Sequence, residues 1–176
     1  MKTLIKHSFF AASALALFAS PGLSSAGSAP ADLAVSSSVT ASCTITTSPV
    51  AFGAYDFVVN ASSPLDNTGT VHTTCSSASL PVVTLGQGAN AGGGSTPGVP
   101  VRRMSNGAGT PAFMSYNLYQ DVDRLILWGN TTLTAPSAVA GTGTNADIIV
   151  YGRVAAGQSL PVAVSYADTV VATVTF

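Results

Sequence analysis

The stretch Tyr166-Ala-Asp-Thr-Val-Val-Ala-Thr-Val-Thr-Phe176 alternates between apolar and polar side chains and therefore predicts a β-strand. Successive side chains of a strand point to opposite faces of the sheet. One face of this strand consequently carries Val170, Ala172, Val174 and Phe176, and we expect that face to be buried. Because the sequence ends with this strand, we expect another chain to supply the strand that covers it.

The remainder of the chain also favours β-structure. Beyond residue 26 the sequence is rich in Val, Thr, Ala, Ser and Gly and poor in Glu, Lys, Gln and Leu, which is the reverse of what helices prefer. Clusters of Gly, Pro, Asn and Asp separate the apolar segments. The predicted strands are residues 33–45, 50–52, 71–75, 80–85, 114–119, 126–128, 146–153 and 162–176. Their number and spacing predict an all-β sandwich in a single domain.

The first 26 residues have the pattern of a secretory signal peptide. Lys2 and Lys6 precede an apolar run at residues 9–18, and small residues follow up to Ala26. The apolar run has about ten residues, which is too short to span a bilayer as a helix. We expect cleavage after Ala26, with Ala29 as the alternative, and export through the Sec pathway without stable membrane insertion.

A second amphipathic strand is predicted at the start of the mature chain. Between residues 32 and 42, one face carries Leu33, Val35, Ser37 and Val39, while the other carries small and polar side chains. This strand lies upstream of both cysteines. Its own domain could therefore hold it, or it could swing free.

The chain contains two cysteines, Cys43 and Cys75. In an exported protein they are expected to form a disulfide, because the compartment is oxidising. On the chain-entropy model, a bridge across roughly thirty residues stabilises the fold by about 3 to 4 kcal/mol. The alternative is a pair of free, buried thiols.

Charge and polar composition argue against several classes of function. Removal of the signal peptide leaves four arginines against seven aspartates, so we expect no basic surface for nucleic acid. His72 is then the remaining histidine, which leaves no second imidazole for a metal site and no clear Ser/His/Asp set for catalysis. We interpret it as an exposed or edge histidine. We expect no catalytic residues, no metal and no cofactor.

Two other segments resemble functional motifs only superficially. Residues 86–98 contain six glycines but lack the Lys-Ser/Thr ending of a phosphate-binding loop, so we interpret them as a surface loop. Asp121 and Asp123 would share one face of a strand, as paired catalytic carboxylates do. We expect these two aspartates to shape a turn beside Arg124 instead.

Ten short motifs follow one another along the mature chain. They are Ala41-Ser-Cys-Thr-Ile45, Phe52-Gly-Ala-Tyr-Asp56, Val71-His-Thr-Thr-Cys75, Leu85-Gly-Gln-Gly88, Arg103-Met104, Tyr116-Asn-Leu-Tyr119, Trp128-Gly129, Val150-Tyr-Gly-Arg153, Ala156-Gly-Gln158 and Tyr166-Ala-Asp-Thr-Val170. This ordered set closely resembles the spore coat protein U domain, and the resemblance covers residues 37–176. That domain forms the subunits of archaic chaperone-usher pili of the Csu type.

The resemblance implies an incomplete immunoglobulin-like sandwich that lacks its final strand and is completed by donor-strand complementation. A periplasmic chaperone would first fill the gap, and the N-terminal strand of the next subunit would replace it at an outer-membrane usher. The donor strand is expected in residues 27–40, ahead of a pilin domain at residues 41–176. Leu33, Val35, Ser37 and Val39 would plug a neighbour's groove, whose border would be Val170, Ala172, Val174 and Phe176.

The expected function is a structural subunit of a cell-surface pilus that supports attachment and biofilm formation. Because Ser37 would face the groove, the register of the donor strand is open by one step of two residues. Two alternative functions also stay open. One is a secreted coat or matrix protein whose N-terminal strand fills its own groove, and the other is a surface- or carbohydrate-binding module that uses Trp128 and Tyr119.

Overall fold

The computed structural model describes residues 26–163 and 165–176 of the chain. The signal peptide predicted for residues 1–26 therefore lies outside the described residues, apart from its last position. The chain divides into two units, Met1–Ser38 and Val39–Phe176. All strands found in the described residues belong to the second unit. Among the described residues, no helix has the length and apolar character needed to cross a membrane.

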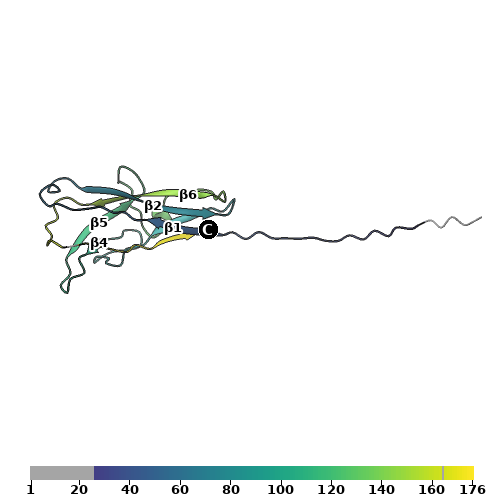
Figure 1. Ribbon diagram of the computed structural model, residues 1–176, viewed down its shortest axis with the longest axis horizontal. Helices are drawn as coiled ribbons and strands as arrows, with labels where there is room; N and C mark the ends of the chain where they lie inside the picture. Colours follow the sequence, from purple (N-terminus) through teal and green to yellow (C-terminus); the bar gives the residue numbers. More distant parts are fainter. Residues whose placement is uncertain (1–25, 164) are drawn as a thin grey trace, which may run out of the picture. The chain divides into compact units, whose positions relative to one another are not determined.

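The second unit is built on a five-stranded antiparallel sheet (Figure 1). Its strands, in spatial order, are β1 (Cys43–Ser48), β2 (Leu65–Cys75), β6 (Asn145–Val154), β5 (Phe113–Tyr119) and β4 (Arg102–Ser105). The longest pairing joins β2 to β6 and runs from Leu65 opposite Val154 to Thr74 opposite Asn145. These two long strands give the sheet a centre that has hydrogen-bonded neighbours on both sides.

A two-stranded antiparallel sheet forms the other layer. It consists of β3 (Val82–Leu85) and β7 (Ala172–Thr175), with Val83 opposite Val174 and Leu85 opposite Ala172. A 3₁₀ turn, η1 (Thr132–Thr134), lies in the loop between β5 and β6. The elements are therefore almost entirely β-strands, which confirms the predicted fold class.

Side chains from both sheets form the core. Its buried members are Val71, Val83, Leu85, Met114, Tyr116, Leu118, Trp128, Val150 and Val154. Trp128 is 0% exposed, and its Nε1 donates a hydrogen bond to the Val83 carbonyl at 3.0 Å. Trp128 therefore stabilises the core and is not accessible to a ligand or a surface.

Two strands extend beyond the prediction. β2 begins at Leu65 instead of at residue 71, because the polar residues after Leu65 pair with the end of β6 although they show no apolar alternation. β4 was not predicted, because its two arginines hide the pattern. Arg102 nevertheless points into the protein and is only 1% exposed.

Five predicted strands are shorter or absent, and the strand predicted at residues 80–85 loses only its first two residues. β1 begins at Cys43, so residues 33–42 are not a strand, and residues 50–52 are not one either. Residues 126–128 contribute a bridge from Leu127 to Tyr119, and residues 162–171 contribute a bridge from Ala167 to Ser105. These segments have strand-like sequences, but a strand also requires a continuous hydrogen-bonded neighbour, which the sequence does not reveal.

Candidate functional site

The sandwich is open along one side, where the edges of the two sheets lie side by side. β1 is the last strand of the five-stranded sheet, and β7 is the last strand of the two-stranded sheet (Figure 1). Within the described residues, each of the two strands has one hydrogen-bonded neighbour, β2 and β3 respectively. The opposite edge of each strand is therefore free to pair with an additional strand.

The hydrogen bonds around β7 show which residues present their backbone groups at its free edge. Val171 accepts from the Gly86 N–H at 2.8 Å, and Thr169 accepts from the Ala89 N–H at 3.0 Å. Hydrogen-bonded and non-hydrogen-bonded positions alternate along an antiparallel pair. The even-numbered residues 170, 172 and 174 therefore direct their N–H and C=O groups towards the free edge.

β1 also presents the backbone groups of alternate residues at its free edge. The Ser76 N–H donates to the Ser42 carbonyl at 2.8 Å, so residues 44, 46 and 48 are the ones that exchange hydrogen bonds with β2. Cys43, Ile45 and Thr47 consequently face the free edge with their backbone groups. The side chain of Ile45 packs against the core, so backbone donors and apolar side chains are exposed along the same opening.

One cavity lies at this opening, and a second cavity adjoins it beyond the end of β1. The first has a volume of about 350 Å³ and is lined on one wall by residues 47–50 and on the other by residues 168–170 and Ala172. The second has a volume of about 510 Å³ and continues towards Leu160 and Tyr166. Val50, Phe52 and Met104 line both cavities. We refer to the two cavities as the open groove.

Three of the four residues predicted to border this groove face it or the core, Ala172 and Val174 from β7 and Val170 from the segment just before it. Val170 and Ala172 line the first cavity, and Val174 packs against the core. Phe176 follows the last residue of β7 and is 53% exposed. The alternation read from the sequence thus holds from residue 166 to residue 174, but the strand ends before Phe176.

One polar side chain interrupts the apolar wall of the groove. Asp168 lines the first cavity between Tyr166 and Val170. Its Oδ2 accepts a hydrogen bond from the Tyr116 hydroxyl at 2.7 Å, and its Oδ1 accepts from the Asn90 N–H at 3.0 Å. Burial, together with the hydrogen bond to Asp168, raises the pKa of Tyr116, so the phenol is a stable donor at neutral pH.

Gly88 makes room for this carboxylate. Its φ angle is +87°, which lies in the left-handed region that favours glycine. A Cβ atom at this position would also overlap the Asp168 carboxylate. Gly88 therefore allows the loop that follows β3 to approach the groove closely.

Arg102 supports the floor of the groove from inside the protein. Its Nε donates to the Gly86 carbonyl at 2.8 Å, and its Nη2 donates to the carbonyls of Leu85 at 2.9 Å and Trp128 at 2.8 Å. Burial lowers the pKa of Arg102 to about 10, which leaves the guanidinium charged at neutral pH. The guanidinium thereby connects β4 to two segments that do not pair with it, residues 85–86 and Trp128.

Sequence reasoning did not identify Tyr116, Arg102 or Asp168 as residues of the site. The available signal was Asp168, because a charged residue stands on the face of the final segment that otherwise carries Tyr166, Val170 and Ala172. A charge on a buried face requires partners. The partners themselves come from distant parts of the chain and carry no local pattern.

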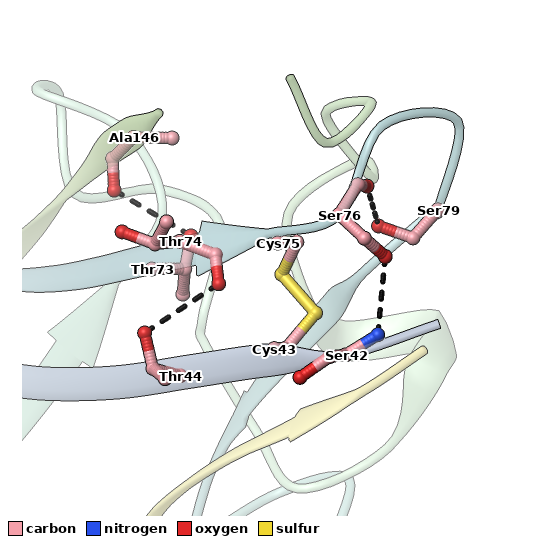
Figure 2. The surroundings of a disulfide bond; sticks show 9 residues. All are labelled: Ser42, Cys43, Thr44, Thr73, Thr74, Cys75, Ser76, Ser79 and Ala146. Atoms are coloured by element: carbon pink, nitrogen blue, oxygen red, sulfur yellow. Dashed lines mark hydrogen bonds between the residues drawn. A yellow bond between two sulfur atoms is a disulfide. The ribbon is translucent and has the colours of Figure 1, made fainter. Parts of the chain in front are cut away.

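A disulfide ties the β1 wall of the groove to the large sheet (Figure 2). Cys43 and Cys75 lie opposite each other in the β1–β2 pairing and are bonded, as the sequence predicts. Just outside the bridge, the Ser42 N–H donates to the Ser76 hydroxyl at 3.1 Å. These contacts anchor the start of β1, whose free edge faces the groove.

His72 keeps a partly exposed side chain and has two polar partners. Its Nε2 lies 3.0 Å from the Ser48 hydroxyl, and its Nδ1 lies 2.7 Å from Oδ1 of Asp147. The hydrogen bond from His72 and, to a smaller extent, the hydrogen bond from Asn145 lower the pKa of Asp147. Ser48 shares the outer face of β1 with Thr46, whereas Ile45 faces the core, so this chain of hydrogen bonds lies away from the groove's apolar floor.

The two aspartates near Arg124 do belong to a turn. Asp121 accepts hydrogen bonds from the backbone N–H groups of Leu125 at 3.0 Å and Ile126 at 2.7 Å. Arg124 instead reaches Asp66, with its Nε 3.5 Å from a carboxylate oxygen. In the described residues, no cluster of three or more His, Cys, Asp or Glu side chains is arranged to hold a metal ion.

The predicted donor residues belong to a segment without regular structure. Residues 26–42 contain no helix or strand, and Leu33, Val35 and Val39 are exposed, Leu33 by 87%. Ser37 is exposed as well. The segment therefore presents its alternating apolar side chains to solvent.

Comparison with known proteins places these features in a family context. The sequence matches a family model described as the Spore Coat Protein U domain over residues 29–173. A relative named Protein U, from Myxococcus xanthus, is 48% identical over 128 residues, which are 71% of this chain and 70% of that protein.

A solved structure has a similar fold. It is the CsuC–CsuE chaperone–tip adhesion subunit pre-assembly complex from the archaic chaperone-usher Csu pili of Acinetobacter baumannii. The superposition has a TM-score of 0.51 at 20% sequence identity and covers 78% of this chain and 40% of the matched chain. At this level of identity the similarity supports the fold alone.

Proposed function

The chain belongs to the Spore Coat Protein U domain family, and from that membership we propose that it is a structural subunit of a chaperone-usher pilus. The subunit is exported to the periplasm and polymerises on the cell surface by donor-strand exchange. The fibre supports attachment and biofilm formation. The protein acts as a building block and not as an enzyme.

The observation that carries this proposal is the open groove between the free edges of β1 and β7. Unpaired backbone groups and apolar side chains such as Ile45, Val170 and Ala172 lie along the same opening. An arrangement of this kind aggregates unless it is covered. A strand inserted between the two edges would satisfy the backbone groups and bury the side chains in one step.

The donor strand in this proposal is residues 27–40 of a neighbouring copy or sibling subunit. Burial of Leu33, Val35 and Val39 contributes about 1.5 to 3 kcal/mol for each side chain, before the cost of ordering the strand is subtracted. Before assembly, a periplasmic chaperone covers the groove with a strand of its own against residues 170–176, and an outer-membrane usher releases the subunit to the fibre. The domain itself is residues 41–176.

The proposal is tested by examining cells that express the chain together with its assembly partners. Electron microscopy should show fibres for the full-length chain and none for a chain that lacks residues 27–40. The shortened chain should remain monomeric in complex with chaperone. Fibres built from the shortened chain would contradict the donor assignment.

A pair of point variants provides a matched control for the deletion. Val35→Asp places a charge on the face that enters the groove, whereas Ala34→Asp places the same charge on the opposite face. We expect the first change to abolish polymers and the second to leave them. Polymers are recognised as ladders on a detergent gel that disappear when the sample is heated.

A second candidate is a secreted coat protein in which the N-terminal strand fills the groove of its own chain. The 48% identity to Protein U and the family's description as the Spore Coat Protein U domain favour this second candidate. Such a protein would be a stable monomer. Unheated samples would then run as a single band, whereas a pilus subunit would run as a ladder.

A further inference from the structure

The donor segment and the open groove each carry one polar residue in an otherwise apolar row of alternate residues. In the donor segment, Ser37 stands between Val35 and Val39. In the groove, Asp168 stands between Tyr166 and Val170. Both rows have the two-residue period of a strand, so the two polar residues can be placed opposite each other.

Asp168 is prepared to accept one more hydrogen bond. A carboxylate has about four lone-pair sites. Among the described residues, Oδ1 accepts from the backbone N–H and the side-chain Nδ2 of Asn90, at 3.0 and 3.1 Å, while Oδ2 accepts from the Tyr116 hydroxyl at 2.7 Å. One site on Oδ2 is therefore left for a hydroxyl that enters the groove from the open side.

We propose that the Ser37 hydroxyl of one subunit donates to the Asp168 carboxylate of the next and thereby sets the register of the donor strand. This proposal rests on the proposed function. The donor strand runs antiparallel to β7. Its side chains then lie opposite the groove residues as Leu33 with Ala172, Val35 with Val170, Ser37 with Asp168 and Val39 with Tyr166.

Side-chain size favours this alignment. Ala172 is the smallest residue on the groove side of β7, and the largest donor residue, Leu33, lies opposite it and above Leu85 on the groove floor. Val39 meets the second cavity beside Met104. A parallel strand with the same Ser37–Asp168 contact would instead place Ala41 against Ala172 and leave two small side chains facing each other.

A slip of two residues is costly in either direction. It would place Val35 or Val39 against the Asp168 carboxylate, which would lose access to water without gaining a hydrogen bond. The same slip would place the Ser37 hydroxyl against Val170 or Tyr166. The polar pair therefore works mainly by penalising the wrong registers.

A charge test examines the Ser37–Asp168 contact in the full-length chain, exported together with its assembly partners. Ser37→Asp places two carboxylates opposite each other, and we expect the amount of heat-sensitive polymer to fall by about tenfold or more. Ser38→Asp adds the same charge on the opposite face and should leave polymer unchanged. Combining Ser37→Asp with Asp168→Asn should restore polymer. Equal polymer from Ser37→Asp and Ser38→Asp, or no restoration, would overturn the contact.

Cysteine cross-linking tests the register directly. Val170→Cys is combined in turn with Leu33→Cys, Val35→Cys and Ser37→Cys, which are one register step apart. Directly opposite residues in a hydrogen-bonded antiparallel pair have Cα atoms about 5.5 Å apart, within the range of a disulfide, whereas diagonal neighbours lie about 7 to 8 Å apart. We expect cross-linked polymers that resist heating for the Val35→Cys combination only.

The outcomes separate this proposal from the proposed function. A link to position 33 or 37 in a polymer overturns the register while donor-strand exchange stands. A link that forms within single chains overturns the transfer of Ser37 to a neighbouring subunit and supports the coat protein. Absence of any heat-sensitive polymer from the unmodified chain overturns the pilus function itself, and with it the register.

Discussion

β6 and β7 have similar alternating sequences, but they differ in the number of neighbours they have. β6 lies between β2 and β5, spans residues Asn145–Val154 and buries Val150 and Val154. β7 pairs with β3 alone, spans Ala172–Thr175 and leaves Ala172 and Val174 half-buried. Alternation gives both strands one apolar face, but in β7 that face is only partly buried.

This difference shows where the sheet has all its hydrogen-bonding partners and where it needs an additional strand. A strand with two neighbours has its backbone groups satisfied and its inner face covered. A strand with one neighbour keeps a row of free donors and acceptors at its edge. In this protein the second situation occurs on both walls of one groove, at β1 and at β7.

The largest expected effect comes from placing the same charge on both strands. Val154→Asp, at a position that is 0% exposed on β6, should lower the free energy of unfolding by about 4 kcal/mol or more, because the carboxylate has no partner there. Val171→Asp, at a position that is 66% exposed beside β7, should change it by less than about 0.5 kcal/mol. Urea unfolding measures both. Equal losses of unfolding free energy would mean that the two positions are equally buried, which would contradict the difference between the strands.

The next effect concerns the anchoring of β1. Replacing Cys43 and Cys75 together by serine should lower the free energy of unfolding by about 3 kcal/mol, because the bridge limits the unfolded chain. Hydrogen exchange should increase in β1 (Cys43–Ser48) more than in β6, since β1 has one neighbouring strand. The unmodified protein under reducing conditions is the control. An equal increase in hydrogen exchange in β1 and β6 would contradict the expected difference between the two strands.

A smaller effect is expected where the closed part of the sandwich meets the open groove. Tyr116→Phe removes the hydroxyl that donates to Asp168, and we expect a loss of about 1 to 2 kcal/mol in unfolding free energy. Tyr119→Phe is the matched control and should be nearly neutral, because its hydroxyl only accepts a longer, 3.3 Å hydrogen bond from the Asn117 side chain. Similar values for the two variants would argue against a special role for the groove carboxylate.

The smallest effect is electrostatic and lies on the closed side. The hydrogen bond from Arg153, which outweighs burial, lowers the pKa of Asp66 below its usual 3.8 in the folded protein. The resulting stability is therefore present above the unfolded pKa and is lost as the pH falls below it through the folded pKa. Because the ion pair is partly exposed, Asp66→Asn should cost at most about 1 kcal/mol at neutral pH. The variant should also flatten the fall of stability below about pH 4.

The β-class and most of the long strands were predictable, because alternation is a local property of the residues. The segment 166–174 illustrates this, since its apolar face in the sequence is the face that lines the groove or packs against the core. The ends of strands were less predictable. β4 carries Arg102 on its buried face, and only three distant carbonyl groups explain how that charge is accommodated.

Part of the candidate site was predictable for the same reason. Val170 and Ala172 were recognised from alternation, and Cys43 and Cys75 from the oxidising compartment expected for an exported chain. The hydrogen-bonded row of Ser48, His72 and Asp147 was not recognised, because its members come from three different strands. Pairing register brings them together, and register is not visible in any one segment.

Local patterns in the sequence were enough to establish that this protein is built from strands, which faces of those strands are apolar, and that one N-terminal segment repeats the same alternation. These properties depend on neighbouring residues along the chain. The tertiary structure alone decided which strands have one neighbour, how β1 and β7 form one groove, and why Asp168 is held by Tyr116 and Asn90. These properties depend on hydrogen-bond pairing between distant segments, which no local pattern encodes.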